Sequence, residues 1–279
     1  MVKEHRDTEK QLADALREIE IWESSQKDLW FWEKLGRLPF MLLDKLTPAV
    51  IQQKIGEAVN EVGAFVQTGG RYLLSEKSVL ERLRKQMPEG SERLELNAVA
   101  RLPLSVMDIT ADQLSASRSK LATVQGATTG FGGLLTLALD IPAILGLSLK
   151  IIQEIGISYG YDPNIREERV FAVKIMQFAS SDIVGKKAIL EELSVFEGGD
   201  GGNQMMSQLQ GWQEVVMLYR DNFGWKKLFQ MIPVAGMLFG AFINRGMLND
   251  VAEAAKMLYR KRRVLQKIEE SREQQNDRI

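Results

Sequence analysis

Apolar residues recur at steps of three and four along much of this chain, and the clearest run lies between two helix-boundary signals. Thr47 is suited to accept backbone N–H groups as an N-cap, and Pro48 fits the first helical position, where its missing donor costs nothing. Gly69 closes the run. The positions between these signals that share one face are Ile51, Ile55, Val59, Val62 and Val66. The spacing predicts an amphipathic helix across this region.

The same pattern returns twice further along the chain. Its apolar positions are Phe171, Ile175 and Phe178 after Asp162-Pro163, and Leu248, Val251, Ala255 and Leu258 near the C-terminus. No stretch alternates apolar and polar residues over the length of a strand, and no such pair flanks an Asn-Gly turn. We therefore predict an all-α protein, a multi-helix bundle of roughly eight to ten helices.

Three glycine- or proline-containing breaks interrupt the helical pattern. Pro88-Glu89-Gly90 ends an N-terminal region, Gly160 and Pro163 mark a tight turn, and the glycine-rich stretch at 198–203 is expected to be an exposed loop. The predicted organisation is an N-terminal helical arm over residues 1–38, a main helical domain over 39–270 and a disordered tail over 271–279.

Two apolar segments contain small residues at helical spacing. The first runs from Gly126 to Tyr161 and the second from Leu228 to Ile243, and each includes one proline, Pro142 or Pro233. Glycines four positions apart remove side chains from one strip of a helix, so that a second helix can approach closely. The pairs with this spacing are Gly126 with Gly130 and Gly236 with Gly240. We predict that both segments form the core of the bundle, either enclosed by protein or entering lipid.

These two segments resemble the signatures of the bacterial EcsC family. The first match is GFGGLLTLALDIPAILGLSLKIIQEIGISYGYDP and the second is FQMIPVAGMLFGAFINRGMLNDVAEAAKMLYRKR. The motif positions are Gly132, Gly133, Asp140, Pro142, Tyr159, Gly160, Asp162, Pro233, Gly236 and Asn244. The resemblance implies a helical bacterial protein with an EcsC-like domain over 39–270. The family is named for a product encoded beside an ABC transporter linked to secretion, and it brings no established reaction or catalytic residue.

Composition removes several kinds of chemistry. The chain has no cysteine and one histidine, His5, so disulfides and thiolate catalysis are impossible and the usual zinc ligands are missing. Carboxylates could still hold Mg²⁺ or Ca²⁺, but no metal site and no cofactor is predicted. The formal net charge of −1 gives no global signal for nucleic acid. The first residues lack the apolar stretch of a secretory signal, which favours the cytoplasm.

The motif residues have a structural and a functional interpretation. Asp140 fits the N-cap of a helix with Pro142 in its first turn, or else a buried carboxylate that faces Asn244 or a metal. Gly160 fits a left-handed helix end, and Asp162 fits the cap of the next helix. The functional alternative is a ligand pocket between the two motif blocks, lined by Asp140, Tyr159, Asp162 and Asn244.

Two further regions suit a membrane surface. Trp30 and Trp32 lie among lysine and arginine residues, and tryptophan suits the headgroup region. The alternative, which we favour, is that these rings pack the arm onto the body. Ten cations against three anions between Arg220 and Lys267 give a local charge of about +7. Its densest part is the run Arg260, Lys261, Arg262 and Arg263, which suits anionic lipid or a solvated helix end.

Three hypotheses of function follow. The leading one is a non-enzymatic cytoplasmic protein that associates peripherally with the inner face of the membrane, on anionic lipid or beside a transporter or secretion component. The second is a small-ligand-binding protein or hydrolase-like enzyme with the pocket described above. The third is a soluble scaffold that uses the charged segments Asp7–Glu23 and Asp250–Arg272. The absence of a G-x-S-x-G elbow and of a phosphate-binding loop favours a protein that is not an enzyme.

Overall fold

The computed structural model consists of α-helices throughout the part of the chain that it describes. The described residues are 7–27, 64–65, 67–69, 76–87, 94–128, 133–180, 183–196 and 247–276, and they contain no strand. The helices are α1 (Glu9–Lys27), α5 (Glu76–Lys85), α6 (Leu96–Val99), α7 (Leu104–Thr128), α8 (Gly133–Ser158), α9 (Arg166–Ser180), α10 (Ile183–Phe196) and α14 (Met247–Asn276). They pack against one another as a bundle, which confirms the predicted fold class.

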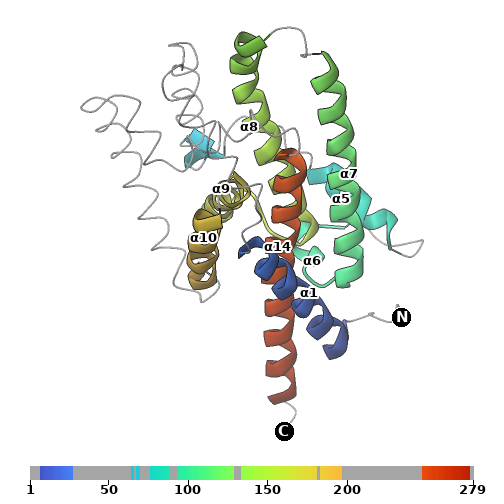
Figure 1. Ribbon diagram of the computed structural model, residues 1–279. Helices are drawn as coiled ribbons and strands as arrows, with labels where there is room; N and C mark the ends of the chain where they lie inside the picture. The colour runs from blue at the N-terminus through green and yellow to red at the C-terminus, as the bar shows by residue number, and fades with distance from the viewer. Residues whose placement is uncertain are drawn as a thin grey trace.

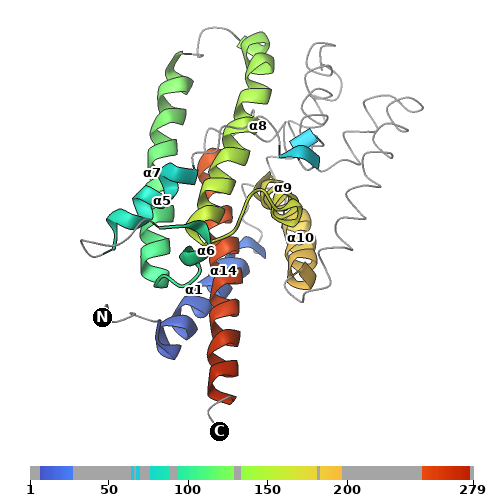
Figure 2. The ribbon, with the colours of Figure 1, turned by 180° about the vertical axis from the view of Figure 1, so that it is seen from behind.

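The C-terminal helix α14 is the axis of this bundle. It contacts α8, α9, α1 and α7, and Figures 1 and 2 show these helices on different sides of it. Val251, Ala255 and Leu258 of the predicted apolar stripe are buried. Because neighbours lie on several sides, α14 also buries side chains outside that stripe, including Tyr259 and Arg263. The helix continues to Asn276, six residues past the predicted domain boundary at 270.

The second half of α8 forms the centre of the core. Its apolar side chains from Leu145 to Ile157 point in all directions around the helix and are nearly all buried, because α14, α7, α5 and α9 all contact it. A Cβ at Gly156 would lie 2.8 Å from Cζ of Tyr259, so this glycine permits the close approach of α8 and α14. The first predicted apolar segment therefore supplies part of the core.

The glycines singled out in the sequence mostly fall elsewhere. Gly126 lies near the end of α7 and Gly133 begins α8, in a region whose side-chain contacts lie outside the description. The whole second apolar segment, from Leu228 to Ile243, lies outside the described residues. The same holds for the remaining glycines, Gly130, Gly132, Gly236 and Gly240. Their role in helix packing stays a prediction.

The prediction that Asp140 caps a helix is wrong. Helix α8 begins at Gly133 and continues without a break through Asp140 and Pro142. An interior proline removes one backbone hydrogen bond and costs about 3 kcal/mol in an isolated helix. The uncharged residues that precede Asp140 continue the helical pattern, and packing of the helix beyond Pro142 keeps the element intact. The helix therefore starts two turns earlier than the proline signal indicated.

Helices α7 and α8 run antiparallel, and both continue past the end of α14. Figures 1 and 2 show the C-terminal end of α7 and the N-terminal end of α8 beyond the red end of α14 where Met247 lies. The chain carries no charge between Lys120 and Asp140, so the far ends of both helices are uncharged. We call residues 121–128 of α7 and 133–139 of α8 the hairpin tip. Within the described residues, no helix has both the length and the apolar character required to cross a bilayer.

The predicted turn after α8 has the expected geometry. Gly160 has a φ of +83°, its N–H donates to the carbonyl of Ile157 at 2.9 Å, and the N–H of Tyr161 donates to the carbonyl of Gly156 at 3.0 Å. This pair of bonds is the Schellman motif, so the predicted helix end at Gly160 is confirmed. Asp162 does not cap α9: its Oδ1 accepts from the N–H of Asn164 at 2.8 Å in a turn that precedes the helix.

Candidate functional site

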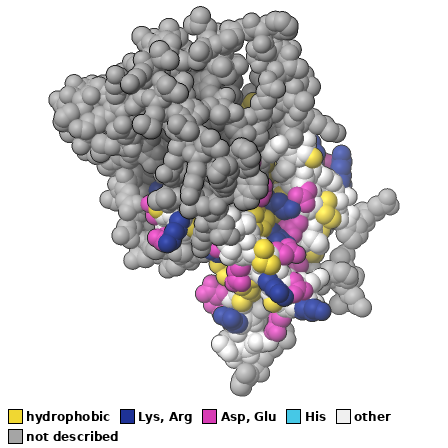
Figure 3. All heavy atoms as spheres, in the orientation of Figure 1, with side chains coloured by type: hydrophobic (Ala, Val, Ile, Leu, Met, Phe, Trp, Pro, Cys, Tyr) yellow, Lys and Arg dark blue, Asp and Glu magenta, His cyan; other side chains and the backbone are white. Residues whose placement is uncertain are grey.

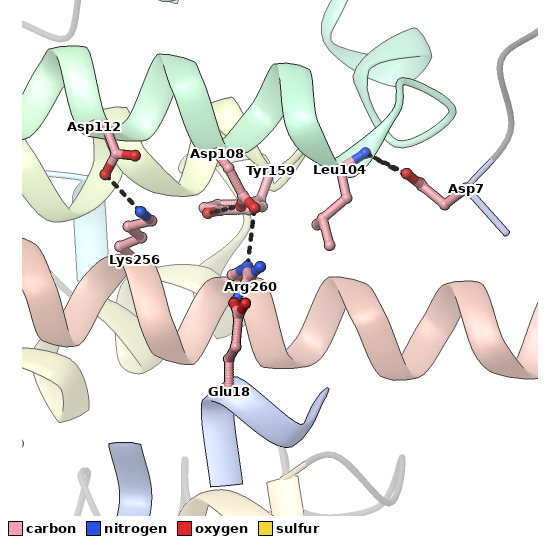
Figure 4. A network of polar contacts seen from close by, with 8 residues as sticks. All are labelled: Asp7, Glu18, Leu104, Asp108, Asp112, Tyr159, Lys256 and Arg260. Atoms are coloured by element: carbon pink, nitrogen blue, oxygen red, sulfur yellow. Dashed lines mark hydrogen bonds and ion pairs between the residues drawn. The ribbon is translucent and has the colours of Figure 1, made fainter. Parts of the chain in front are cut away.

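A polar cluster lies where α7, α14 and α1 meet the turn after α8 (Figure 4). The Tyr159 hydroxyl donates to Oδ1 of Asp108 at 2.7 Å, and Nε of Arg260 donates to Oδ2 of the same carboxylate at 3.0 Å. A second nitrogen of Arg260 donates to Glu18 at 2.8 Å. We call Asp108, Tyr159, Arg260 and Glu18 the polar hub. It joins helices that lie up to 242 residues apart in the chain.

Burial and neighbouring charge set the ionisation of the hub. Burial raises the pKa of the Asp108 carboxyl, while the charge of Arg260 and the hydrogen bond from Tyr159 act to lower it. Burial also raises the pKa of the Tyr159 hydroxyl well above its ordinary value, and the adjacent Asp108 carboxylate adds to this. Desolvation lowers the pKa of Arg260, but Asp108 and Glu18 outweigh it and raise the pKa. Arg260 is therefore a cation and Tyr159 a neutral donor.

Further hydrogen bonds and ion pairs lie on either side of the polar hub. Both carboxylate oxygens of Asp7 accept from the backbone N–H of Leu104, at 2.9 and 3.0 Å, so the N-terminal segment caps α7. Lys267 of α14 donates to Asp7 and to the carbonyl of Leu102, each at 2.7 Å. Figure 4 also shows the pair between Lys256 and Asp112 along the same two helices. The base of α7 is thus fixed to α14 and to the arm.

The basic run of α14 is paired inside the bundle. Arg260 belongs to the polar hub, and Lys261 donates to Glu23 of α1 at 2.9 Å. Arg262 makes two bonds to Glu168 of α9, at 2.9 and 2.7 Å, and Nε of Arg263 donates to the backbone carbonyl of Tyr159 at 2.8 Å. None of the four is an exposed side chain. The run is therefore not the free basic surface that the sequence indicated, and it is not a solvated helix end either.

The reason is the position of α14 rather than its composition. Four consecutive residues point around the whole helix, at about 100° steps, and α14 has neighbours on several sides. The four cations therefore meet polar groups of α7, α1, α9 and the turn after α8. On the face shown in Figure 3, Lys and Arg side chains of the described residues are interspersed with Asp and Glu. The local excess of about +7 that the sequence shows is thus partly neutralised by partners far away in the chain.

Two of the four residues predicted to line a ligand pocket are described, and the side chains of both are bound to other groups of the protein. Tyr159 is fully buried and its hydroxyl is taken up by Asp108, and Asp162 accepts from Asn164 in the turn before α9. The Asp140 side chain and all of Asn244 lie outside the described residues. No group of three or more Asp, Glu or His side chains in the described part of the chain is arranged to hold a metal ion.

The arm contacts the body through one of its tryptophans. The indole N–H of Trp22 donates to Glu253 of α14 at 2.7 Å, and its ring lies 5.6 Å from that of Phe178 on α9. Trp30 and Trp32, which were predicted to suit a membrane surface, lie outside the described residues. Trp22, the tryptophan of the arm that is described, packs the arm onto the body.

Two polar side chains of α8 have buried atoms without hydrogen-bond partners. These atoms are the hydroxyl of Ser148 and both amide atoms of Gln153. A buried amide that makes no hydrogen bond costs roughly 1–3 kcal/mol. Both residues occur within an apolar helical pattern.

Buried tyrosines give this part of the fold a pH dependence. Burial raises the pKa of both Tyr159 and Tyr259 well above 10.0, and Asp108 and Glu168 respectively add to it. When the pKa of a group is higher in the folded than in the unfolded protein, the group contributes stability that is fully present below the unfolded-state pKa. This stability is lost as the pH rises through the folded-state pKa. We expect both hydroxyls to ionise together with alkaline unfolding. Tyrosinate absorbance and far-ultraviolet circular dichroism measured in one titration check this.

The variants Tyr159→Phe and Tyr259→Phe provide the control for that titration. Each should remove one late-ionising hydroxyl from the absorbance change. Ionisation of both groups near the ordinary tyrosine value, with the helical signal unchanged, would contradict the burial described here.

The comparisons with known proteins agree on one family. The model of the EcsC protein family matches residues 13–264. The chain is 56% identical to "Uncharacterized protein YdbA" of Bacillus subtilis (strain 168) over 261 residues, which cover 93% of this chain and 95% of that protein. It is 29% identical to "Protein EcsC" of the same organism over 158 residues, which cover 57% of this chain and 64% of that protein. No solved structure matches the chain.

Proposed function

The chain belongs to the EcsC protein family, and from this premise we propose that it is a non-enzymatic protein that associates peripherally with the inner face of the bacterial membrane. The contact we propose is the hairpin tip, residues 121–128 of α7 and 133–139 of α8. Docking there would place the helical body in the cytoplasm, beside membrane components such as a transporter or a secretion component.

One observation carries this proposal: α7 and α8 continue past the end of α14 with no charge between Lys120 and Asp140. A surface helix that faces water normally carries charged residues on its outer side. Nineteen consecutive uncharged residues at the far end of a helical pair fit an apolar environment better than water. Leucine dominates the first turns of α8, where Leu134, Leu135, Leu137 and Leu139 occur within six residues.

The polar contacts at the other end of the hairpin support the same arrangement. Asp108 of α7 and Tyr159 after α8 bond to each other, and Arg260 holds them on α14. The Asp7 cap fixes the start of α7. The hairpin is thus anchored at its base by charge-assisted hydrogen bonds, which are about twice as strong as neutral ones. An anchored base would hold the far ends of α7 and α8 in a fixed position relative to the body.

The polar groups near the hub favour a structural over a catalytic role. Asp108, Arg260 and Tyr159 satisfy one another, and Arg262 and Glu168 form a closed pair. A catalytic constellation needs at least one group free to meet a substrate. The printed names of the two relatives state no catalytic activity.

Flotation with phospholipid vesicles tests the proposal. Leu135→Glu puts a charge in the hairpin tip, where transfer of an acidic side chain to lipid is costly, so we expect it to abolish most of the co-flotation of the wild-type protein. The matched control is Ile109→Glu, the same kind of change on α7 at a side chain that is 45% exposed outside the tip. The control should float as the wild type does.

Two outcomes would overturn the proposal. One is a wild-type protein that stays at the bottom of the gradient with every vesicle composition. The other is equal flotation of wild type and Leu135→Glu, with circular dichroism showing that both are folded.

A further inference from the structure

Helix α1 covers one face of the body. It lies against α14 (Figures 1 and 2), contacts α10, and reaches Phe178 of α9 through the ring of Trp22. Its side chains Leu12, Ala15 and Ile19 are buried. They follow one another at steps of three and four, so they form one side of the helix. We call the face of α14 and α10 that α1 covers the arm-binding face.

Cations of the arm-binding face meet polar side chains of the arm. Each of these contacts runs from a Lys or Arg of the body to a side-chain oxygen of the arm, over 2.7 to 2.9 Å. The four pairs are Arg260 with Glu18, Lys261 with Glu23, Lys267 with Asp7 and Lys186 with Gln26. Part of the basic excess that the sequence shows near the C-terminus therefore lies beneath the arm.

The arm has the complementary charge. Residues 7–27 include six Asp or Glu and three Lys or Arg, which gives a net charge of −3. An acidic amphipathic helix thus rests on a face that offers it apolar and basic contacts. Proteins recognise helices of their partners in the same way, by taking up the apolar side of an amphipathic helix. The arm shows which ligand chemistry this face fits.

The contact of the arm combines few buried side chains with ion pairs at its edge. In the pair with Arg260, 65% of the Glu18 side chain is exposed, and exposed ion pairs contribute little to stability. An element held in this way opens at lower cost than the core unfolds. Asp108 would still accept hydrogen bonds from Arg260 and Tyr159 without α1. We therefore expect the bundle to stay folded when the arm leaves.

We propose that the arm-binding face is a docking site for an acidic amphipathic helix of a partner protein, and that α1 occupies this site as a built-in competitor. The partner helix presents apolar side chains in the places of Leu12, Ala15 and Ile19. It presents carboxylates in the places of Glu18 and Glu23. A competitor within the same chain acts at a high effective concentration, so the partner binds weakly until the arm is weakened. This inference does not depend on the membrane association proposed above.

A fluorescent peptide of residues 7–27 is the probe, and fluorescence anisotropy measures its binding to the full chain. Ile19→Asp puts a charge on the buried side of the arm, which displaces the arm. We expect the peptide to bind this variant at least about tenfold more tightly than it binds the wild-type chain. The matched control is Ile21→Asp, the same change at a side chain of α1 that is 62% exposed. It should bind the peptide as weakly as the wild type does.

A charge exchange locates the bound peptide. Glu23→Lys in the peptide should weaken its binding to the Ile19→Asp chain several-fold, and Lys261→Glu in that chain should restore it. Circular dichroism establishes that each variant is folded. If Ile19→Asp does not fold, the chain variant Glu23→Lys replaces it, because it only opposes Lys261. The expected gain in peptide binding is then smaller and in the same direction.

Several results would overturn the proposal. These are a folded Ile19→Asp chain that does not bind the peptide, equal binding by wild type, Ile19→Asp and Ile21→Asp, and a failure of Lys261→Glu to restore binding. Light scattering of the wild-type chain tests the remaining source of an acidic helix. A dimer that forms as the concentration rises and is lost in Ile19→Asp would assign the face to the arm of a second copy, against a separate partner protein.

Discussion

Replacement of Arg262 by alanine is expected to lower the free energy of unfolding by about 3–5 kcal/mol, because it leaves a buried carboxylate without its partner. The Arg262 side chain is 11% exposed and its partner Glu168 is 10% exposed. The guanidinium also lies over the rings of Tyr161 and Phe171, at 4.2 and 4.3 Å from their centres. A third ring, Tyr259, lies 5.9 Å away. Removal of Arg262 therefore takes away a bidentate ion pair and three cation–π contacts at once. Urea unfolding followed by circular dichroism measures the loss.

A surface pair of the same chemistry is the control for Arg262. Arg84 lies 3.3 Å from Glu81 on α5, with 44% and 58% of the two side chains exposed. Exposed pairs contribute about 0–1 kcal/mol, so Arg84→Ala should change stability little. The double variant Arg262→Met with Glu168→Leu should recover much of the loss, because it removes both buried charges together. Equal effects of Arg262→Ala and Arg84→Ala would show that Arg262 is solvated, as a lipid-binding cation would be.

Replacement of Gly160 by alanine is expected to cost about 2–4 kcal/mol. Its φ of +83° lies in the left-handed region, which costs an ordinary residue about 1–2 kcal/mol. A Cβ there would also lie 2.9 Å from the backbone nitrogen of Ala100, and overpacking of this kind costs about 1–3 kcal/mol. The displaced segment includes Tyr159, whose carbonyl binds Arg263. The shift in the urea midpoint measures the combined effect.

Gly69 separates the two causes. Its φ of +88° is similar, but no atom of the described residues lies within 4 Å of a Cβ built on it. Gly69→Ala should therefore cost only the conformational part, about 1–2 kcal/mol. If the two variants are equally destabilised, the close approach of Gly160 to Ala100 contributes nothing, and the packing described between these segments is wrong.

The helical fold was predictable because its signals are local. Gly160 and Gly69 end helices where the sequence places them, and Val251, Ala255 and Leu258 share the buried face that their spacing indicates. A proline signal was misleading in one place, since α8 passes through Pro142. Spacing along the chain reports which face is apolar, and it does not report how tightly neighbours hold an interior proline.

The polar hub was not predictable, because its partners are distant in sequence. Nothing near Arg260 in the chain points to Asp108 or Glu18, which lie 152 and 242 residues away. The basic run therefore looked like a free surface when counted by charge alone. A signal was present: four consecutive cations cannot share one face of a helix, so some had to point toward neighbouring helices.

The most direct test of the account is the salt dependence of wild-type flotation on neutral and on anionic vesicles. Exposed charges more than about 10 Å apart are screened at 0.1 M salt, so binding through a basic surface would fall steeply. Since the basic run of α14, residues 260–263, is paired within the bundle and the hairpin tip is uncharged, we predict flotation on both lipids that changes little between low and high salt. Flotation that needs anionic lipid and disappears in salt would contradict the account.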